Sequence, residues 1–314
     1  MISLLWLKKF LDVKMSEQKY NYHHVPVLLN ESIEALVQDP SGVYLDVTYG
    51  GGGHSKEILR RLDDKAFLFG FDQDDAVKAN LPLDDRFIWI KSNFKYLKKY
   101  MEYFKIEKLD GVLADLGVSS FHFDEDGRGF SFQSQASLDM RMNQEQSLRA
   151  IDVLMNYSEA QLTAIFFEYG ELTNAKKIAQ RIVQDRKNRK WDSCISFAHW
   201  AEDFVYGKRN KWMAQLFQAL RIEVNQELTS LQMLLEDATE LLKPEGRLVI
   251  ISYHSLEDRL VKNWMKKERS IDMIYGRKNY IFSSWSKHAI IPSEAEQEIN
   301  SRSRSAKMRV ATKA

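Results

Sequence analysis

The fold is decided by the stretch Val43-Tyr-Leu-Asp-Val-Thr-Tyr-Gly-Gly-Gly-Gly-His54. Its first six residues are largely apolar and β-branched, which predicts a buried strand. A run of glycines follows, and residues 54–62 then have the pattern of a helix. A strand, a glycine-rich turn and a helix in this order predict an α/β domain whose turn can approach a ligand closely.

Further strands alternate with helices beyond this motif. Strands are predicted at 66–72, 86–90 and 109–115, with a helix at 94–104. Strands separated by helices predict βαβ units and a mostly parallel sheet. After a long polar loop over 121–142, residues from about 147 to 236 are spaced as helices, and strand character returns at 246–253 and 307–312.

The simplest organisation is therefore an α/β domain built from both ends of the chain and interrupted by an inserted all-α domain. We predict four regions. Residues 1–20 form an N-terminal extension with little fixed order, and residues 21–125 form the first part of the α/β domain. Residues 126–225 form the helical insertion that recognises the substrate, and residues 226–314 form the second part of the α/β domain.

Composition excludes several classes of protein. The 314 residues are 44% hydrophobic and 28% charged, as in globular proteins, and the net charge is only +1. Any contact with a polyanion must therefore come from local basic clusters. The single cysteine, Cys194, excludes an internal disulfide framework and a cysteine-rich zinc site, and it fits a cytoplasmic protein. We predict no metal site, and no apolar run reaches the roughly 20 residues of a membrane helix.

The glycine-rich turn indicates which cofactor the chain binds. A dinucleotide fingerprint needs a third glycine where this chain has Ser55 or Lys56, so that fingerprint fails. An acidic strand end followed by glycines suits S-adenosylmethionine better than a dinucleotide, because S-adenosylmethionine has no pyrophosphate. Asp72 ends the second strand, where an acid bonds ribose hydroxyls, although it could instead cap a helix. Phe94 could pack on the adenine or simply belong to the core.

Two segments after later strands are candidates for the reacting site. Asp115 follows the fourth strand, beside the first, and could accept the protons of an amine that is methylated or hold the methionine part of the cofactor. His254, after the fifth strand, could touch the substrate or accept a proton, or only begin a helix. No G-x-S-x-G motif accompanies it, which excludes the usual hydrolase arrangement.

These motifs together resemble one family, the bacterial 16S ribosomal RNA cytosine-N4 methyltransferases (the RsmH or MraW family). The resemblance extends from about His24 to the C-terminus. It rests on residues 24–31, 46–54, 115–120, Arg128-Gly-Phe-Ser-Phe132, Leu138-Asp-Met-Arg-Met142, Tyr169-Gly-Glu171, Phe217-Gln-Ala-Leu-Arg-Ile-Glu-Val-Asn225, Ile251-Ser-Tyr-His-Ser-Leu-Glu-Asp-Arg259 and Arg304-Ser-Ala-Lys-Met-Arg309.

The resemblance implies a Rossmann-like class I methyltransferase that uses S-adenosylmethionine to methylate N4 of one cytidine in the decoding region of 16S rRNA. The implied cofactor contacts are Gly52, Gly53, His54, Asp72, Phe94, Asp115 and His122. Members of the family usually have the sequence Ser-Ser-Pro-Gln here, whereas this chain has Ser119-Ser-Phe-His122. His122 therefore stands where the family usually has Gln. As substrate contacts we predict Arg141, Asn225 and Ser255, although Asn225 and the segment 138–142 could instead serve structural packing. Asp115 and His254 are the predicted catalytic residues. Asn210-Lys-Trp-Met-Ala214 also departs from the family's His-Pro-Ala segment.

Basic residues cluster despite the neutral total. They gather at 302–313, at 181–190 beside Trp191, and at 208–211 beside Trp212, a pattern that suits phosphate contact and base stacking. Each cluster alone could be a solvated face.

Two alternatives to the implied function stay open. One is a methyltransferase with another acceptor, such as DNA or a different RNA amine, and the other is a non-catalytic RNA-binding assembly factor. The oligomeric state, a homodimer included, is also open.

Overall fold

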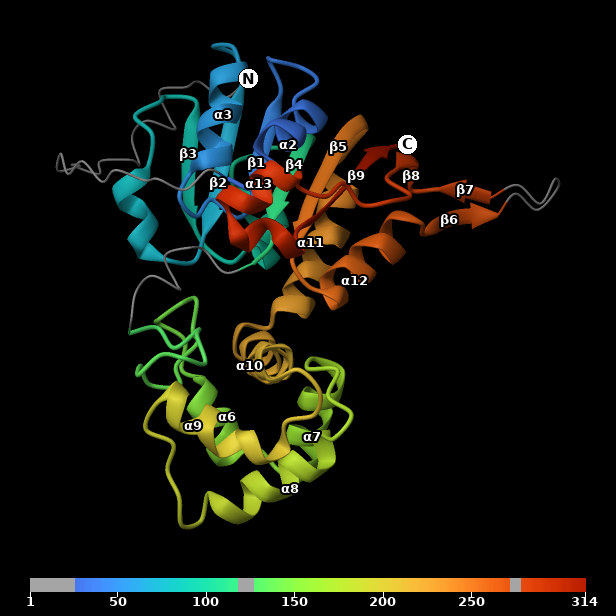
Figure 1. Ribbon diagram of the computed structural model, residues 1–314. Helices are drawn as coiled ribbons and strands as arrows, with labels where there is room; N and C mark the ends of the chain where they lie inside the picture. Colours follow the sequence, from blue (N-terminus) through green and yellow to red (C-terminus); the bar gives the residue numbers. More distant parts are fainter. Residues whose placement is uncertain (1–25, 118–126, 272–277) are drawn as a thin grey trace.

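The computed structural model describes residues 26–117, 127–271 and 278–314 (Figure 1). The predicted extension at 1–20 and the predicted cofactor contact His122 lie outside the described residues. At the centre is a seven-stranded sheet with the order β3-β2-β1-β4-β5-β9-β8. Its strands are β1 (Val43–Asp46), β2 (Phe67–Asp72), β3 (Phe87–Lys91), β4 (Leu109–Asp115), β5 (Leu242–Ser252), β8 (Phe282–Trp285) and β9 (Lys307–Lys313).

The first five strands of the sheet are parallel, whereas β9 runs antiparallel to β5 and β8 antiparallel to β9. All six strands predicted from the sequence are therefore confirmed, with ends that shift by a few residues. The four-residue β8 was missed, because Phe-Ser-Ser-Trp has no alternation of its own and forms a strand only by pairing with β9.

Helices cover both faces of the sheet (Figure 1). Tyr44 of β1 packs in one core with α2 (Leu29–Leu36) and α3 (Gly53–Arg61). The next residue, Leu45, points to the opposite face. There it joins a second core with α4 (Leu97–Tyr103), α11 (Glu227–Leu241) and α12 (Ser255–Met265). Burial on both faces explains why β1 is almost continuously apolar. We call this part of the molecule the α/β lobe.

Shorter elements complete the α/β lobe. They are the 3-10 turns η1 (Asp75–Asn80), η2 (Phe94–Tyr96) and η4 (Ser301–Ser305), helix α13 (Glu294–Ile299), and the hairpin of β6 (Glu268–Ile271) and β7 (Lys278–Tyr280). The hairpin projects from the side of the lobe in Figure 1.

A second group of helices lies below the sheet in Figure 1 and has a core of its own. We call it the helical lobe. It consists of α6 (Ala150–Asn156), α7 (Glu159–Glu168), α8 (Ala175–Asp185), α9 (Cys194–Ala201), η3 (Glu202–Phe204) and α10 (Arg209–Asn225). Residues 127–149 carry no helix or strand and pack against this core through Phe130, Leu138 and Met140.

Trp191 and Trp212 are only 3% and 4% exposed, inside the core of the helical lobe. The prediction that they stack on RNA bases beside the basic clusters is therefore wrong. The sequence showed an aromatic residue next to cations. Large aromatic rings, however, stabilise the fold most when they are buried in the core. Of the helices described, none is long and apolar enough to cross a membrane.

Candidate active site

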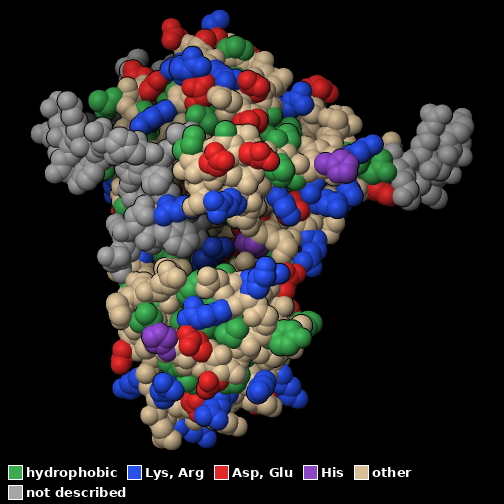
Figure 2. All heavy atoms as spheres, viewed as in Figure 1, with side chains coloured by type: hydrophobic (Ala, Val, Ile, Leu, Met, Phe, Trp, Pro, Cys, Tyr) green, Lys and Arg blue, Asp and Glu red, His purple; other side chains and the backbone are tan. Residues whose placement is uncertain are grey.

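A cavity of about 640 Å³ lies at the carboxyl ends of the central strands and extends to the helical lobe. The strand order reverses between β1 and β4, and this is where ligands bind in open α/β sheets. Both lobes line it, and Figure 2 shows Lys and Arg side chains on both sides of the hollow between them. The predicted site residues that line the cavity are Gly53, His54, Asp72, Phe94, Asp115, Asn225 and His254, whereas Gly52, Arg141 and Ser255 do not.

The glycine-rich turn brings bare backbone to the cavity wall. Gly50, Gly51 and Gly53 line the wall. Gly52 has φ of 75°, and a Cβ atom there would collide with the Tyr49 hydroxyl. Only glycine fits such a position without strain, so Gly52 shapes the turn that its neighbours present to a ligand.

Two acids at strand ends have different roles. Asp46 is 1% exposed, and its carboxylate accepts hydrogen bonds from Ser55 Oγ at 2.6 Å and from the Thr48 N–H at 3.2 Å. It therefore holds the turn from inside, and burial raises its pKa. Asp72, in contrast, lines the cavity and accepts the Gly50 N–H at 2.8 Å. Asp72 is thus the acid that a ligand meets beside the glycines.

Asp115 lies at the end of β4 and is held from several sides. The Tyr253 hydroxyl donates to Asp115 Oδ1 at 2.7 Å, and the Asp115 N–H donates to Thr48 Oγ1 at 2.6 Å. His54 Nδ1 lies 3.9 Å from the other carboxylate oxygen, while His54 Nε2 lies 3.1 Å from the Val27 carbonyl. Burial raises the pKa of Asp115 to about 6. A fixed carboxylate with such a pKa can accept a proton near neutral pH.

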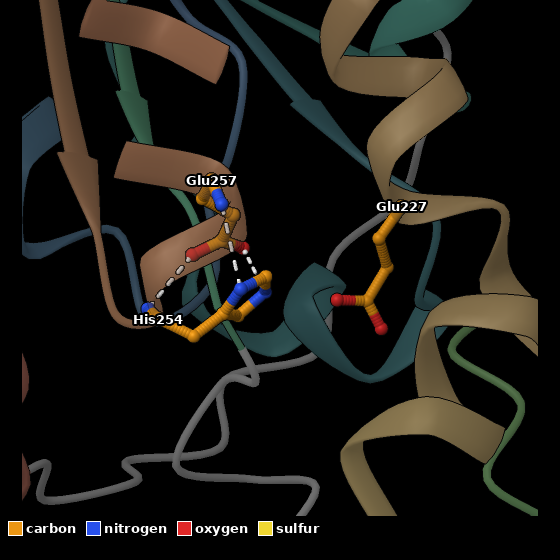
Figure 3. Close-up of side chains that lie close together, drawn as sticks. All are labelled: Glu227, His254 and Glu257. Carbon is orange, nitrogen blue, oxygen red and sulfur yellow. Dashed lines mark hydrogen bonds and ion pairs between the residues drawn. The ribbon is translucent and has the colours of Figure 1, made fainter. Parts of the chain in front are cut away.

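Figure 3 shows His254 beside Glu257, with Glu227 of the neighbouring helix facing them. One ligand atom from each of the three lies within 4.8 Å of the others. Imidazole nitrogen and carboxylate oxygens are a donor set that zinc accepts. However, Arg221 already pairs with both oxygens of Glu227 at 2.9 Å.

Glu257 is also occupied, because Oε2 accepts the Tyr253 N–H at 2.9 Å and the His254 N–H at 3.3 Å. Its other oxygen lies 3.1 Å from His254 Nε2. The contact with Nε2 places the imidazole against Glu257 at the cavity wall. The expectation of no metal stays a prediction.

The three predicted substrate contacts are bonded to the protein itself. The Asn225 amide donates to the Met140 carbonyl at 2.8 Å and accepts the Met142 N–H at 2.8 Å. Arg141 forms two bonds of 2.8 Å with the carboxylate of Asp139. Ser255 donates to a Glu171 oxygen at 2.8 Å. Asn225 therefore holds the segment that carries Met142 to the cavity, and its contact with substrate stays a prediction.

The C-terminal basic cluster is partly neutralised by an acid that is remote in sequence. Arg309 is 5% exposed and pairs with Asp258 at 2.6 Å. Lys307 lies 3.7 Å from the same carboxylate. Arg302 lines the cavity and is the member of this cluster best placed to meet a ligand there.

Sequence reasoning missed Tyr253 and Glu257, although both lie in the motif around His254. The only available signal was their position at the end of the predicted strand 246–253 and just beyond it. The partner of Tyr253 could not be read from it, because 138 residues separate Tyr253 from Asp115. Glu257, in contrast, bonds to the backbone of Tyr253 and His254, which are four and three residues away.

Comparison with known proteins agrees with this architecture. Residues 21–314 match the model of the MraW methylase family. The ribosomal RNA small subunit methyltransferase H of Phocaeicola vulgatus is 47% identical over 304 residues, covering 95% of this chain and 100% of that protein. The protein of the same name from Azobacteroides pseudotrichonymphae is 48% identical over 297 residues, covering 93% and 98%. An rRNA methylase structure from Streptococcus thermophilus covers 90% of this chain and 90% of its own, with 11% identity and a TM-score of 0.39.

A family match over this length, together with relatives of such identity, decides the family. The chain therefore belongs to the MraW methylase family, which confirms the family predicted from its sequence together with the S-adenosylmethionine-dependent class I methyltransferase fold.

Proposed function

We propose that this protein transfers a methyl group from S-adenosylmethionine to the exocyclic N4 of a specific cytidine in the decoding region of 16S rRNA, in the cytoplasm. The observation that carries the proposal is the Asp115 carboxylate, fixed by Tyr253 at the wall of the cofactor cavity. The names of the relatives, which act on small-subunit ribosomal RNA, support the substrate class.

The cavity fits the proposed cofactor. Its volume of about 640 Å³ lies in the usual range for small-ligand sites. Asp72 would accept hydroxyl hydrogens of the ribose, Phe94 would pack on the adenine, and the backbone of Gly50, Gly51 and Gly53 would allow close approach. When bound, S-adenosylmethionine supplies an electrophilic methyl group on a sulfonium centre.

The protein's own residues then have to position the amine and remove its proton. The lone pair of a cytosine amine is delocalised into the ring, so the nitrogen is a weak nucleophile. A hydrogen bond from the amine to Asp115 increases electron density on the nitrogen. Because its pKa is about 6, Asp115 is mostly ionised at pH 7, and it can take the proton as the new N–C bond forms. Tyr253 keeps the carboxylate oriented.

We further propose that the helical lobe and the preceding loop, residues 126–225, recognise the RNA. They contribute Met142, Gln218 and Arg221 to the cavity opposite the sheet. A cytidine would enter between the lobes after being turned out of its stack. Phosphate contacts by basic residues would make RNA affinity fall steeply as salt increases.

The test is methyl transfer from labelled S-adenosylmethionine to isolated small subunits, followed by nucleoside analysis, with Asp115→Ala as the control. We expect label in N4-methylcytidine for the wild type and a loss of about 10²–10⁴-fold in rate for the variant. Label in another nucleoside would overturn the substrate assignment. Wild-type transfer no greater than that of the variant would favour the assembly-factor alternative.

A further inference from the structure

A second cavity, of about 500 Å³, adjoins the active site between the two lobes. On the α/β lobe it is lined by Gln73, Lys91, Ser92, Asn93, Lys95 and Tyr96, and on the other side by Asn143 and by residues 145–148 and 224–226. Gln73, Ser92, Asn93 and Asn225 line both cavities, so the two are immediate neighbours. Apart from Leu148 and Val224, every lining residue that the structure describes has a polar side chain. We call this cavity the side groove.

Tyr96 gives the side groove an aromatic surface. It is 40% exposed, in contrast to the buried Trp191 and Trp212. The ammonium groups of Lys95 and Lys99 each lie 5.3 Å from the centre of its ring. An exposed ring with two cations beside it is the combination that holds a nucleotide, through base stacking and phosphate contact.

The charges of the side groove also favour an anionic ligand. Its one acidic lining residue, among those described, is Glu145, which pairs with Lys91 at 2.7 Å. Lys91 also pairs with Asp75 at 2.5 Å, so its own charge is already compensated. Lys95 instead donates to the neutral amide of Gln226 at 3.1 Å. That bond leaves the charge of Lys95 available to a phosphate.

We propose that the side groove binds a nucleotide of the RNA strand that flanks the methylated residue, with its base stacked on Tyr96 and its phosphate held by Lys95 and Lys99. This inference rests on the proposed function, because it takes RNA as the substrate. Stacking moves a lysine from the ring face toward the backbone of the RNA. The exchange is favourable, because an exposed cation–π contact is weaker than base stacking.

The test compares Tyr96→Ala, Tyr96→Phe and Tyr103→Ala in methyl transfer to small subunits. Tyr103 is 60% exposed on the helix that follows and does not line the groove, so it is the matched control. We expect Tyr96→Ala to raise KM for subunits about tenfold, with kcat and the Kd for S-adenosylmethionine unchanged. Tyr96→Phe, which keeps the ring, and Tyr103→Ala should stay within twofold of the wild type. An unchanged KM in Tyr96→Ala would overturn the proposal.

A binding measurement separates this inference from the proposed function. Affinity for a single-stranded RNA containing the target cytidine is measured by fluorescence anisotropy from 50 to 300 mM salt. Removing the phosphate contact in the Lys95→Ala, Lys99→Ala double variant should reduce the slope of log K against log salt by about 0.7. If subunits are not methylated, but the lysine variant shows the reduced slope and Tyr96→Ala binds the same RNA about tenfold more weakly, the side groove binds RNA and the methylation proposal fails. An unchanged slope would refute the role of the two lysines.

Discussion

Replacing Asp115 by Asn tests the electrostatics on which the proposed chemistry depends. Asn keeps the shape of the side chain and can still accept the hydrogen bond that Tyr253 donates, but it cannot ionise. The pKa of Asp115 is raised from 3.8 to about 6 in the folded protein. At about 1.36 kcal/mol per pKa unit, this difference corresponds to about 3 kcal/mol of free energy of unfolding.

Proton binding decides in which direction the contribution of Asp115 to the free energy of unfolding changes with pH. The folded state holds the Asp115 proton more tightly than the unfolded state, so this group stabilises the fold fully below pH 3.8. The stabilisation is lost as the pH rises through about 6, because folding then keeps a carboxylate in a poorly hydrated site. Asp115→Asn has no such loss. Part of this loss lies outside the range from pH 4 to pH 7, so within that range the variant should gain about 2 kcal/mol relative to the wild type.

The assay is urea unfolding of both proteins, followed by circular dichroism at half-unit steps of pH. The quantity of interest is the difference in free energy of unfolding between the variant and the wild type, because other titrating groups cancel in it. A difference that stays constant within about 0.5 kcal/mol over this range would refute the reasoning. Methyl transfer measured in parallel should fall by about 10²–10⁴-fold in the variant, since the proton acceptor is gone.

Three further results are expected. Tyr253→Phe removes the hydrogen-bond donor to the Asp115 carboxylate. The midpoint of the pH profile of kcat/KM should then move upward by about one pH unit. An unmoved midpoint would show that this hydrogen bond does not lower the pKa of Asp115. Gly52→Ala should lower the free energy of unfolding by about 1–3 kcal/mol and weaken cofactor binding in calorimetry, because φ is 75° there. Gly127→Ala should change neither quantity, because among the described residues no atom beyond its chain neighbours lies within 4 Å of the added carbon. The Cys194 thiol, buried and with its pKa raised to about 12, should react with a disulfide reagent only after unfolding, and fast labelling of the native protein would contradict its burial.

The sequence by itself determined the alternation of strands and helices, the glycine-rich turn and the acids at the strand ends. Each depends on residues that are near one another in the chain. Runs such as Phe67–Asp72 are apolar enough to be strands wherever they lie in the sheet. Parallel strands then bring their carboxyl ends to one edge, so Asp72 and Asp115 could be placed at one site without coordinates.

Only the tertiary structure decided which side chains share that site and which are buried. The bond between Tyr253 and Asp115 spans 138 residues, and Arg309 meets Asp258 across 51. Trp212 is buried while Tyr96 is exposed, although each has lysine as a neighbour in the sequence. The physical reason is that burial and pairing depend on how distant segments pack together, and the local order of residues carries no record of that packing.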